Sequence, residues 1–231
     1  MIFTRNKLLG ARFQAFRETH GEYVLLLDSD QILEKSALER CVSMMEEYDM
    51  LALGELTADP STYLQKLFKA DRVMIDRIGS SHLDVRTGTM LPRFFRSSVL
   101  RVAFSHIPEF LFKDVVAHDH AIIYLEANRV SKRVGFVPES LYSHEPSRVT
   151  ELWFKNFRLG RSMWPLLRSP YWNFVWTKTR LRAGRQGNEE SSLSDLLLLM
   201  KGLPFISGIF VGGFVNFGKS VFGHRPENGG S

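Results

Sequence analysis

The chain has almost no cysteine, and its N-terminus lacks the apolar run of an export signal. Cys41 is the single cysteine among 231 residues, which excludes an internal disulfide framework and a zinc site built from several cysteines. Within residues 1–16, basic side chains interrupt the apolar ones, so no secretory signal is predicted. We therefore expect a protein of a reducing compartment, with the cytoplasm favoured.

Basic residues are concentrated in the C-terminal third of the chain. The net charge is +5, and between residues 151 and 201 nine basic residues stand against four acidic ones, together with all four tryptophans. This composition suits phosphates, anionic lipid headgroups or nucleic acid, and it equally suits a solvated basic face around core aromatics. No nucleic-acid-binding motif accompanies it, so a nucleic-acid partner is not expected.

Apolar spacing predicts helices that alternate with strands. We expect helices over 7–19, 32–45, 62–78 and 119–130, and strands over 23–28, 50–53, 91–96, 133–137 and 141–143, with a loop over 79–90. From Thr150 onward the chain is predicted to be helical, with a polar break over 183–192. The alternation predicts an α/β fold with a parallel sheet and covering helices.

The stretch GEYVLLLDSDQIL, residues 21–33, places two acids directly after a buried strand. In open α/β sheets ligands bind beyond the carboxyl ends of the strands, so Asp28 and Asp30 occupy a site position. A pair of carboxylates there suits a hard divalent cation, Mg²⁺ or Mn²⁺, which also binds phosphate. The alternative is that Asp30 caps the following helix.

Together with three other segments, this stretch resembles glycosyltransferase family 2, a GT-A-type family with an Asp-x-Asp at a strand end. GARFQAFRETHG is similar to the family's Ala-Arg-Asn-x-Gly helix and places Arg12 on its arginine, although Phe13 and Ala15 depart from the pattern. DVVAHDHAIIYLEANRV resembles the segment with the catalytic acid pair, and His118 stands where a Glu is usual. YSHEPSRVTELWFKNFRLGRS resembles the family's His-containing strand and following helix.

The resemblance implies a partial GT-A-like mixed sheet flanked by helices over residues 1–165, followed by a helical, membrane-associating extension over 166–231. It implies metal-dependent, inverting transfer of a sugar from a nucleotide-sugar donor to a lipid-linked or polysaccharide acceptor. The family's first β-α units precede the Arg12 helix. We therefore expect either that the chain is a fragment, inactive alone, or that a complementary N-terminal chain supplies the rest.

Each candidate site residue has a role under this interpretation. Arg12 and Asp28 are expected to bind the donor, with Asp28 suited either to the metal or to the ribose hydroxyls. Asp119 is the candidate catalytic base; the alternative is an N-cap of a helix that begins at His120. His144 is a candidate third metal ligand beside Asp28 and Asp30, with a hydrogen-bonded structural histidine as the alternative. Arg158 and Arg161 are candidates for a diphosphate clamp, with a solvated basic helix face as the alternative, and Arg93 and Arg96 are expected near the acceptor.

Residues 202–218 carry no charge, and a run of 17 residues is at the lower limit for a membrane-spanning helix. Gly208 and Gly212 form a small-xxx-small pair of the kind found where helices approach closely. A buried or interfacial hairpin is the alternative, favoured by Pro204. We expect this segment to lie on the cytoplasmic face of a membrane.

The alternative to a glycosyltransferase is a noncatalytic remnant or subunit that binds a membrane or a glycosyltransferase partner.

Overall fold

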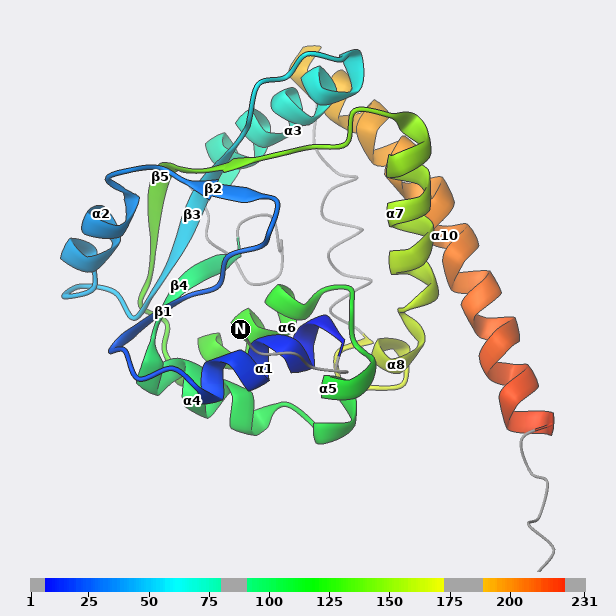
Figure 1. The fold of residues 1–231 in the computed structure, drawn as a ribbon, viewed down its shortest axis with the longest axis horizontal. Helices are drawn as coiled ribbons and strands as arrows, with labels where there is room; N and C mark the ends of the chain where they lie inside the picture. Colours follow the sequence, from blue (N-terminus) through cyan, green and yellow to red (C-terminus); the bar gives the residue numbers. More distant parts are fainter. Residues whose placement is uncertain (1–6, 80–90, 173–188, 223–231) are drawn as a thin grey trace, which may run out of the picture.

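The structure is a computed structural model that describes residues 7–79, 91–172 and 189–222 (Figure 1). Within these residues the chain forms an α/β arrangement around one five-stranded sheet with the strand order β1-β4-β3-β5-β2. The strands are β1 (Tyr23–Leu25), β2 (Gln31–Leu33), β3 (Met50–Thr57), β4 (Pro92–Arg96) and β5 (Val134–Ser143).

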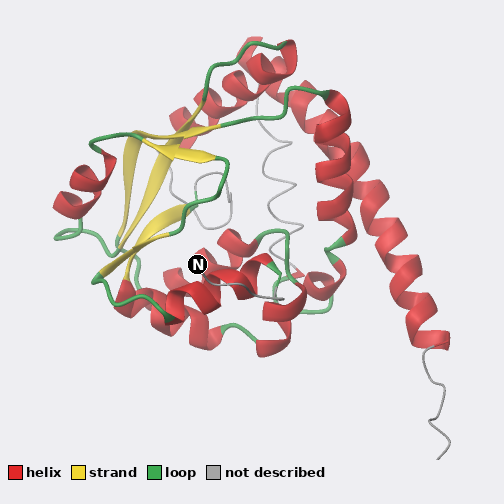
Figure 2. Cartoon of the chain, in the orientation of Figure 1, coloured by secondary structure: helices red, strands yellow, loops and turns green. Residues whose placement is uncertain are grey.

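The sheet is mixed, so the parallel sheet predicted from the alternation of elements is wrong. Only β3 and β5 pair in parallel, whereas β1 with β4, β3 with β4, and β2 with β5 are antiparallel. Local periodicity identifies strands but does not fix their direction, which depends on long-range pairing. The mixed sheet flanked by helices, expected from the family resemblance, is confirmed (Figure 2).

The two edge strands are joined by a short connection that carries the acid pair. β1 and β2 lie at opposite ends of the strand order, although only residues 26–30 separate them in sequence. Ile32 therefore lies in a strand, and the helix predicted over 32–45 begins only at Ala37. As a result, the segment that contains Asp28 and Asp30 runs from one edge of the sheet to the other.

Helices cover both faces of the sheet (Figure 2). The largest buried cluster lies between the sheet and α1, α4, α5 and α6, and contains Phe95, Phe104 and Tyr124. A smaller cluster around Cys41 and Leu51 lies under α2. The helices are α1 (Leu8–Arg17), α2 (Ala37–Met44), α3 (Tyr63–Gly79), α4 (Ser97–His106), α5 (Glu109–Asp114), α6 (Asp119–Val130), α7 (Val149–Arg161), α8 (Trp164–Leu167) and α10 (Glu189–Phe222).

Most of the periodicity predictions match these elements. The helices predicted over 7–19, 62–78 and 119–130 are confirmed as α1, α3 and α6, and the strands over 23–28, 50–53 and 91–96 as β1, β3 and β4. The two short strands predicted over 133–143 form one strand, β5. The predicted loop over 79–90 lies outside the described residues except for Gly79, which is the last residue of α3. Of the polar break predicted over 183–192, only residues 189–192 are described, and they are helical in α10, so the break is not seen there. Helices α4 and α5 were not predicted.

The C-terminal apolar segment is part of one long helix that packs against α7. α10 continues through Pro204, so the hairpin alternative is wrong. A Cβ on Gly208 would lie 2.1 Å from the Phe157 carbonyl oxygen, and one on Gly212 would lie 2.6 Å from that of Arg161. The predicted close approach at this glycine pair is therefore confirmed, and α7 is its partner. Within α10, Leu193–Phe214 is long and apolar enough to cross a membrane, by length and composition alone.

Candidate functional site

The two acids lie in a tight turn, which we call the acid turn (residues 28–31). The Gln31 N–H donates to the Asp28 carbonyl at 3.1 Å, and the Asp28 N–H donates to the Gln31 side-chain oxygen at 3.0 Å. The Asp30 carbonyl accepts the His144 N–H at 2.9 Å. The next helix, α2, begins at Ala37 with Ser36 before it, so the alternative of Asp30 as a helix cap is wrong.

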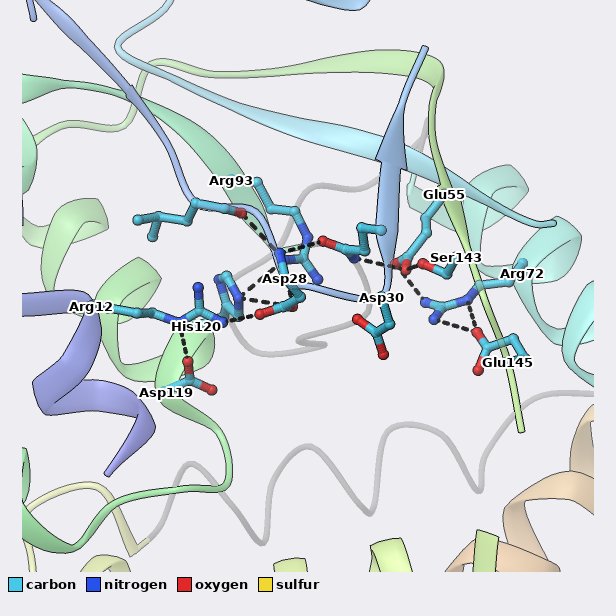
Figure 3. Close-up of polar contacts among 12 residues, drawn as sticks. Arg12, Asp28, Asp30, Glu55, Arg72, Arg93, Asp119, His120, Ser143 and Glu145 are labelled. Carbon is cyan, nitrogen blue, oxygen red and sulfur yellow. Dashed lines mark hydrogen bonds and ion pairs between the residues drawn. The ribbon is translucent and has the colours of Figure 1, made fainter. Parts of the chain in front are cut away.

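A buried arginine joins the acid turn to the candidate base. Arg12, 8% exposed on α1, donates from Nη2 to Asp28 and from Nε to Asp119 (Figure 3). Burial by itself would lower the pKa of Arg12, but the charges of Asp119 and Asp28 raise it above its ordinary value. Two acids that are 91 positions apart in the sequence therefore share one fixed cation.

Asp28 has a second arginine partner from the sheet. Arg93 on β4 donates from Nη1 to Asp28 Oδ2 at 3.0 Å, and His120 Nε2 lies 3.6 Å from the same oxygen. Burial would raise the pKa of Asp28, but its polar neighbours, above all the charges of Arg12 and Arg93, hold it well below its usual range. Asp28 is therefore a carboxylate throughout the physiological pH range.

His120 is buried beside these charges and is neutral. Its Nε2 lies 3.0 Å from Arg93 Nη1, and burial lowers its pKa below the ordinary value for histidine. Since an arginine can only donate, Nε2 is the acceptor and the ring proton is on Nδ1. In the part of the chain that the structure describes, His120 Nδ1 is buried without a hydrogen-bond partner.

Asp119 is the first residue of α6, and it is 6% exposed. The residue before the helix is His118, whose φ of 62° places it in the left-handed region. The alternative of Asp119 as the N-cap of a helix that begins at His120 is therefore wrong, because Asp119 is already helical and its carboxylate faces Arg12. A carboxylate in the first turn of a helix also benefits from the helix dipole.

A second buried ion cluster lies behind the acid turn. Glu55 on β3 accepts from Arg72 Nη1 at 2.7 Å, from Gln31 Nε2 at 2.9 Å and from the Ser143 hydroxyl (Figure 3). Arg72, on α3, also donates to Glu145 at 2.8 Å. Burial would raise the pKa of Glu55, but the charges of Arg72 and Arg93 lower it below the ordinary value. Glu55 is therefore an ionised anchor for Gln31.

A cavity of about 1060 Å³ lies between the start of α1, the end of α5 and α7. The predicted pair Arg158 and Arg161 both line it, together with Lys7 and Lys155. Asp114 and Glu151 are also in its wall, so the lining carries a net positive charge. Lys155 Nζ lies 3.7 Å from an Asp30 oxygen, which connects this wall to the acid turn.

The three expected metal ligands, Asp28, Asp30 and His144, differ in how accessible they are to a cation. Asp30 is about half exposed, and the exposed His144 is joined to it by a backbone hydrogen bond. Asp28 has both carboxylate oxygens paired with arginines. Across the described ranges, no group of three or more His, Cys, Asp and Glu side chains is arranged to hold a metal ion. A cation would need ligand atoms from the donor, or the release of an arginine from Asp28.

The sequence reasoning missed several members of the site. Arg93 was assigned to the acceptor region, but it contacts Asp28, whereas Arg96 forms ion pairs with Glu22 at 2.9 Å and Asp49 at 3.3 Å. Gln31 and His120 had one available signal, since each directly follows a predicted functional acid. Glu55 and Arg72 had no signal in the local pattern. Only the pairing of β3 with β5 and the packing of α3 on the sheet bring them together.

Comparison with known proteins places the acid turn in a known family segment. The model of "Glycosyl transferase family 2" matches residues 2–90, which include Arg12, Asp28 and Asp30. The resemblance found in the sequence is thus confirmed over this segment, which does not extend to Asp119. A search of the curated proteins finds no match.

Three similar solved structures are of Staphylococcus aureus TarS. The TarS 1-349 structure is 14% identical with a TM-score of 0.44, and the match covers 90% of this chain and 62% of that one. The same fragment in complex with UDP-GlcNAc is 15% identical with a TM-score of 0.43, covering 86% and 60%. A further TarS structure is 16% identical with a TM-score of 0.40, covering 87% and 41%. This chain therefore spans about three fifths or less of each.

Proposed function

We propose, from the match of residues 2–90 to glycosyl transferase family 2, that this chain is a glycosyltransferase. It would transfer a sugar from a nucleoside diphosphate sugar to a hydroxyl group of a lipid-linked or polysaccharide acceptor. The observation that carries the proposal is the Arg12 bridge, which brings Asp28 of the family segment to Asp119, a buried carboxylate from a distant part of the chain. A donor-binding acid and a base must be close together for this chemistry.

The donor diphosphate is assigned to the basic cavity beside Asp30. Lys155, Arg158 and Arg161 lie on one helix, and Lys7 faces them across the cavity. Guanidinium groups can bind phosphate oxygens in a bidentate manner and can neutralise the charge that develops on a departing diphosphate. This geometry supports the predicted roles of Arg158 and Arg161, and it adds Lys7 and Lys155 as further cations.

Asp119 is assigned as the base that accepts the proton of the acceptor hydroxyl. Arg12 fixes one of its oxygens, which orients the carboxylate at the start of α6. A positioned base typically accelerates such a step by about 10²- to 10⁴-fold. Direct attack of the activated hydroxyl on the sugar carbon would invert the anomeric configuration, in agreement with the expectation from the family resemblance.

A divalent cation, Mg²⁺ or Mn²⁺, is part of the proposal through Asp30, with His144 as its neighbour and with donor phosphate oxygens completing the set. Asp28 would join these ligands only by exchanging an arginine partner. When bound, the ion would supply charge neutralisation at the leaving diphosphate. In our proposal the chain's own residues orient the donor and acceptor and take up the proton.

The exposed face of α10 supports membrane attachment. Leu199, Leu203, Ile206, Phe210 and Phe214 are each more than half exposed and follow helical spacing. Such an apolar stripe on a long helix is typical of a segment that contacts lipid. We propose that α10 attaches the enzyme to the cytoplasmic face of a membrane, which suits a lipid-linked or cell-envelope acceptor.

The test is a donor screen with a matched pair of variants. The full chain is incubated with Mn²⁺ or Mg²⁺ and a panel of nucleoside diphosphate sugars, and release of the nucleoside diphosphate is measured. Asp119→Asn should reduce kcat by about 10²-fold or more with donor binding retained. Asp59→Asn is the control, because Asp59 is an exposed acid in a left-handed conformation that Asn tolerates.

Two outcomes would contradict the proposal. Turnover by Asp119→Asn equal to that of the unaltered chain would remove Asp119 from the mechanism. Donor binding with no turnover for any sugar or acceptor, together with stable binding to a second glycosyltransferase chain, would favour the noncatalytic subunit.

A further inference from the structure

We propose that Gln31 is a positioning residue, which fixes the acid turn by connecting it to the buried Glu55–Arg72 ion cluster. The inference rests on the proposed function, because it assigns to Gln31 the task of holding Asp28 and Asp30 in place for the donor. The evidence for it is the pair of hydrogen bonds that the Gln31 side chain forms. Gln31 Oε1 accepts from the Asp28 N–H at 3.0 Å, and Gln31 Nε2 donates to Glu55 Oε1 at 2.9 Å.

The chemical pattern of these partners requires an amide at position 31. The Asp28 N–H can only donate and the ionised Glu55 carboxylate can only accept, so the connecting group must be an acceptor at one end and a donor at the other. Glutamine satisfies both ends. A glutamate of the same size would place two carboxylates about 2.9 Å apart behind the acid turn.

Glu55 is itself held firmly, so it can serve as an anchor. Arg72 Nη1 and the Ser143 hydroxyl both donate to it, and Arg72 is in turn held by Glu145. These partners come from α3, from the last residue of β5 and from the segment that follows it. The anchor is therefore set by the positions of α3 and of the end of β5 beside β3.

The acid turn has little other internal support. One backbone hydrogen bond closes it, from the Gln31 N–H to the Asp28 carbonyl, and the Asp30 carbonyl accepts from His144. The Gln31 side chain adds the bond that satisfies the Asp28 N–H. Because Asp28 is also fixed by Arg12 and Arg93, loss of Gln31 should release the backbone of the turn and the exposed Asp30 more than the Asp28 carboxylate.

The experiment is a swap of the two polar groups, made in the full chain. Gln31→Glu should disrupt the connection by charge repulsion, and Glu55→Gln alone should weaken the anchor. The double variant Gln31→Glu/Glu55→Gln restores one donor and one acceptor in the reverse order, so it should recover the connection. Gln14→Glu is the control, because it makes the same chemical change at a half-buried position on α1, outside residues 28–31.

The first readout is hydrogen exchange of the Asp28 amide, measured by NMR. Gln31→Glu should accelerate this exchange by about 10-fold or more relative to core amides, since the half-buried Asp28 N–H would lose its hydrogen-bond partner. The double variant should return to within about 3-fold of the unaltered chain, which identifies a pairwise interaction and not a general loss of stability. Gln14→Glu should leave it unchanged.

The second readout is turnover of a nucleoside diphosphate sugar. Gln31→Glu should lower kcat by about 10-fold or more with KM for the donor within about 3-fold, and the double variant should regain most of kcat. Unchanged Asp28 exchange in Gln31→Glu, or a double variant no better than Gln31→Glu alone, would overturn the inference. If no donor is turned over by any chain, the proposed function fails, and the exchange measurement still decides the role of Gln31.

Discussion

The strongest stability prediction concerns Arg12, because this one side chain holds two acids inside the protein. We consider Arg12→Met, which keeps an unbranched apolar side chain while it removes the charge and both hydrogen bonds. Arg12 and Asp119 are each 8% exposed as side chains, and Asp28 is 28% exposed. In the variant Asp28 keeps Arg93, whereas Asp119 loses the cation that compensates its charge.

The magnitude follows from these contacts. Breaking a buried ion pair by removal of one partner costs about 3 to 5 kcal/mol, since the remaining charge is left uncompensated. Asp28 keeps its ion pair with Arg93 in the variant, so the loss of stability at Asp28 is smaller than at Asp119. We therefore expect Arg12→Met to lower the free energy of unfolding by about 3 kcal/mol at pH 7. Arg96→Met is the control, because Arg96 pairs with Glu22 and Asp49 at a more exposed position and should cost about 1 kcal/mol or less.

The cost should also depend on pH. The folded protein lowers the pKa of Asp28 below its unfolded value of about 4. The paired carboxylate therefore stabilises the fold above that unfolded pKa, and this contribution is lost as the pH falls through the lower folded pKa. Removal of Arg12 takes away part of that contribution. The difference between Arg12→Met and the unaltered chain should therefore be largest at neutral pH and should shrink below about pH 4.

The assay is urea unfolding followed by circular dichroism at several pH values, with the m-value used to check that both chains unfold in the same way. A loss of less than about 1 kcal/mol at pH 7 would refute the reasoning, because it would mean that the Arg12 bridge is not a buried ion pair in solution. If the free energy of unfolding lost in Arg12→Met is the same at pH 7 and pH 3, the electrostatic explanation of that loss is refuted.

Two further predictions concern the metal and the membrane. Asp30→Asn should weaken Mn²⁺ binding in the presence of a nucleoside diphosphate by about 10-fold or more, measured by calorimetry, while Asp59→Asn should leave it unchanged; equal affinities would remove Asp30 from the metal proposal. Leu203→Ser combined with Phe210→Ser should reduce sedimentation with anionic lipid vesicles, because both side chains are more than 60% exposed on α10. Unchanged sedimentation would show that this face does not contact the bilayer.

The local elements of the chain could be predicted from sequence because their causes are local. Apolar spacing near 3.6 residues identified α1, α3 and α6, and the apolar run before Asp28 identified β1 and the acid turn at its end. Even the close approach at Gly208 and Gly212 was predicted from the four-residue spacing of small side chains. The family resemblance was carried by short motifs of the same local kind.

Long-range pairing decided the rest. The direction of the strands, and hence the mixed sheet, depends on hydrogen bonds between segments that are far apart in the sequence. The same is true of the site, where Arg12 meets Asp119 across 107 positions and Arg93 meets Asp28 across 65. A local pattern specifies which residues are charged, but the energy of a charge depends on burial and partners, which only the tertiary structure sets. For this reason the sequence identified Asp28 and Asp119 as candidate acids, and the fold determined which arginines hold them.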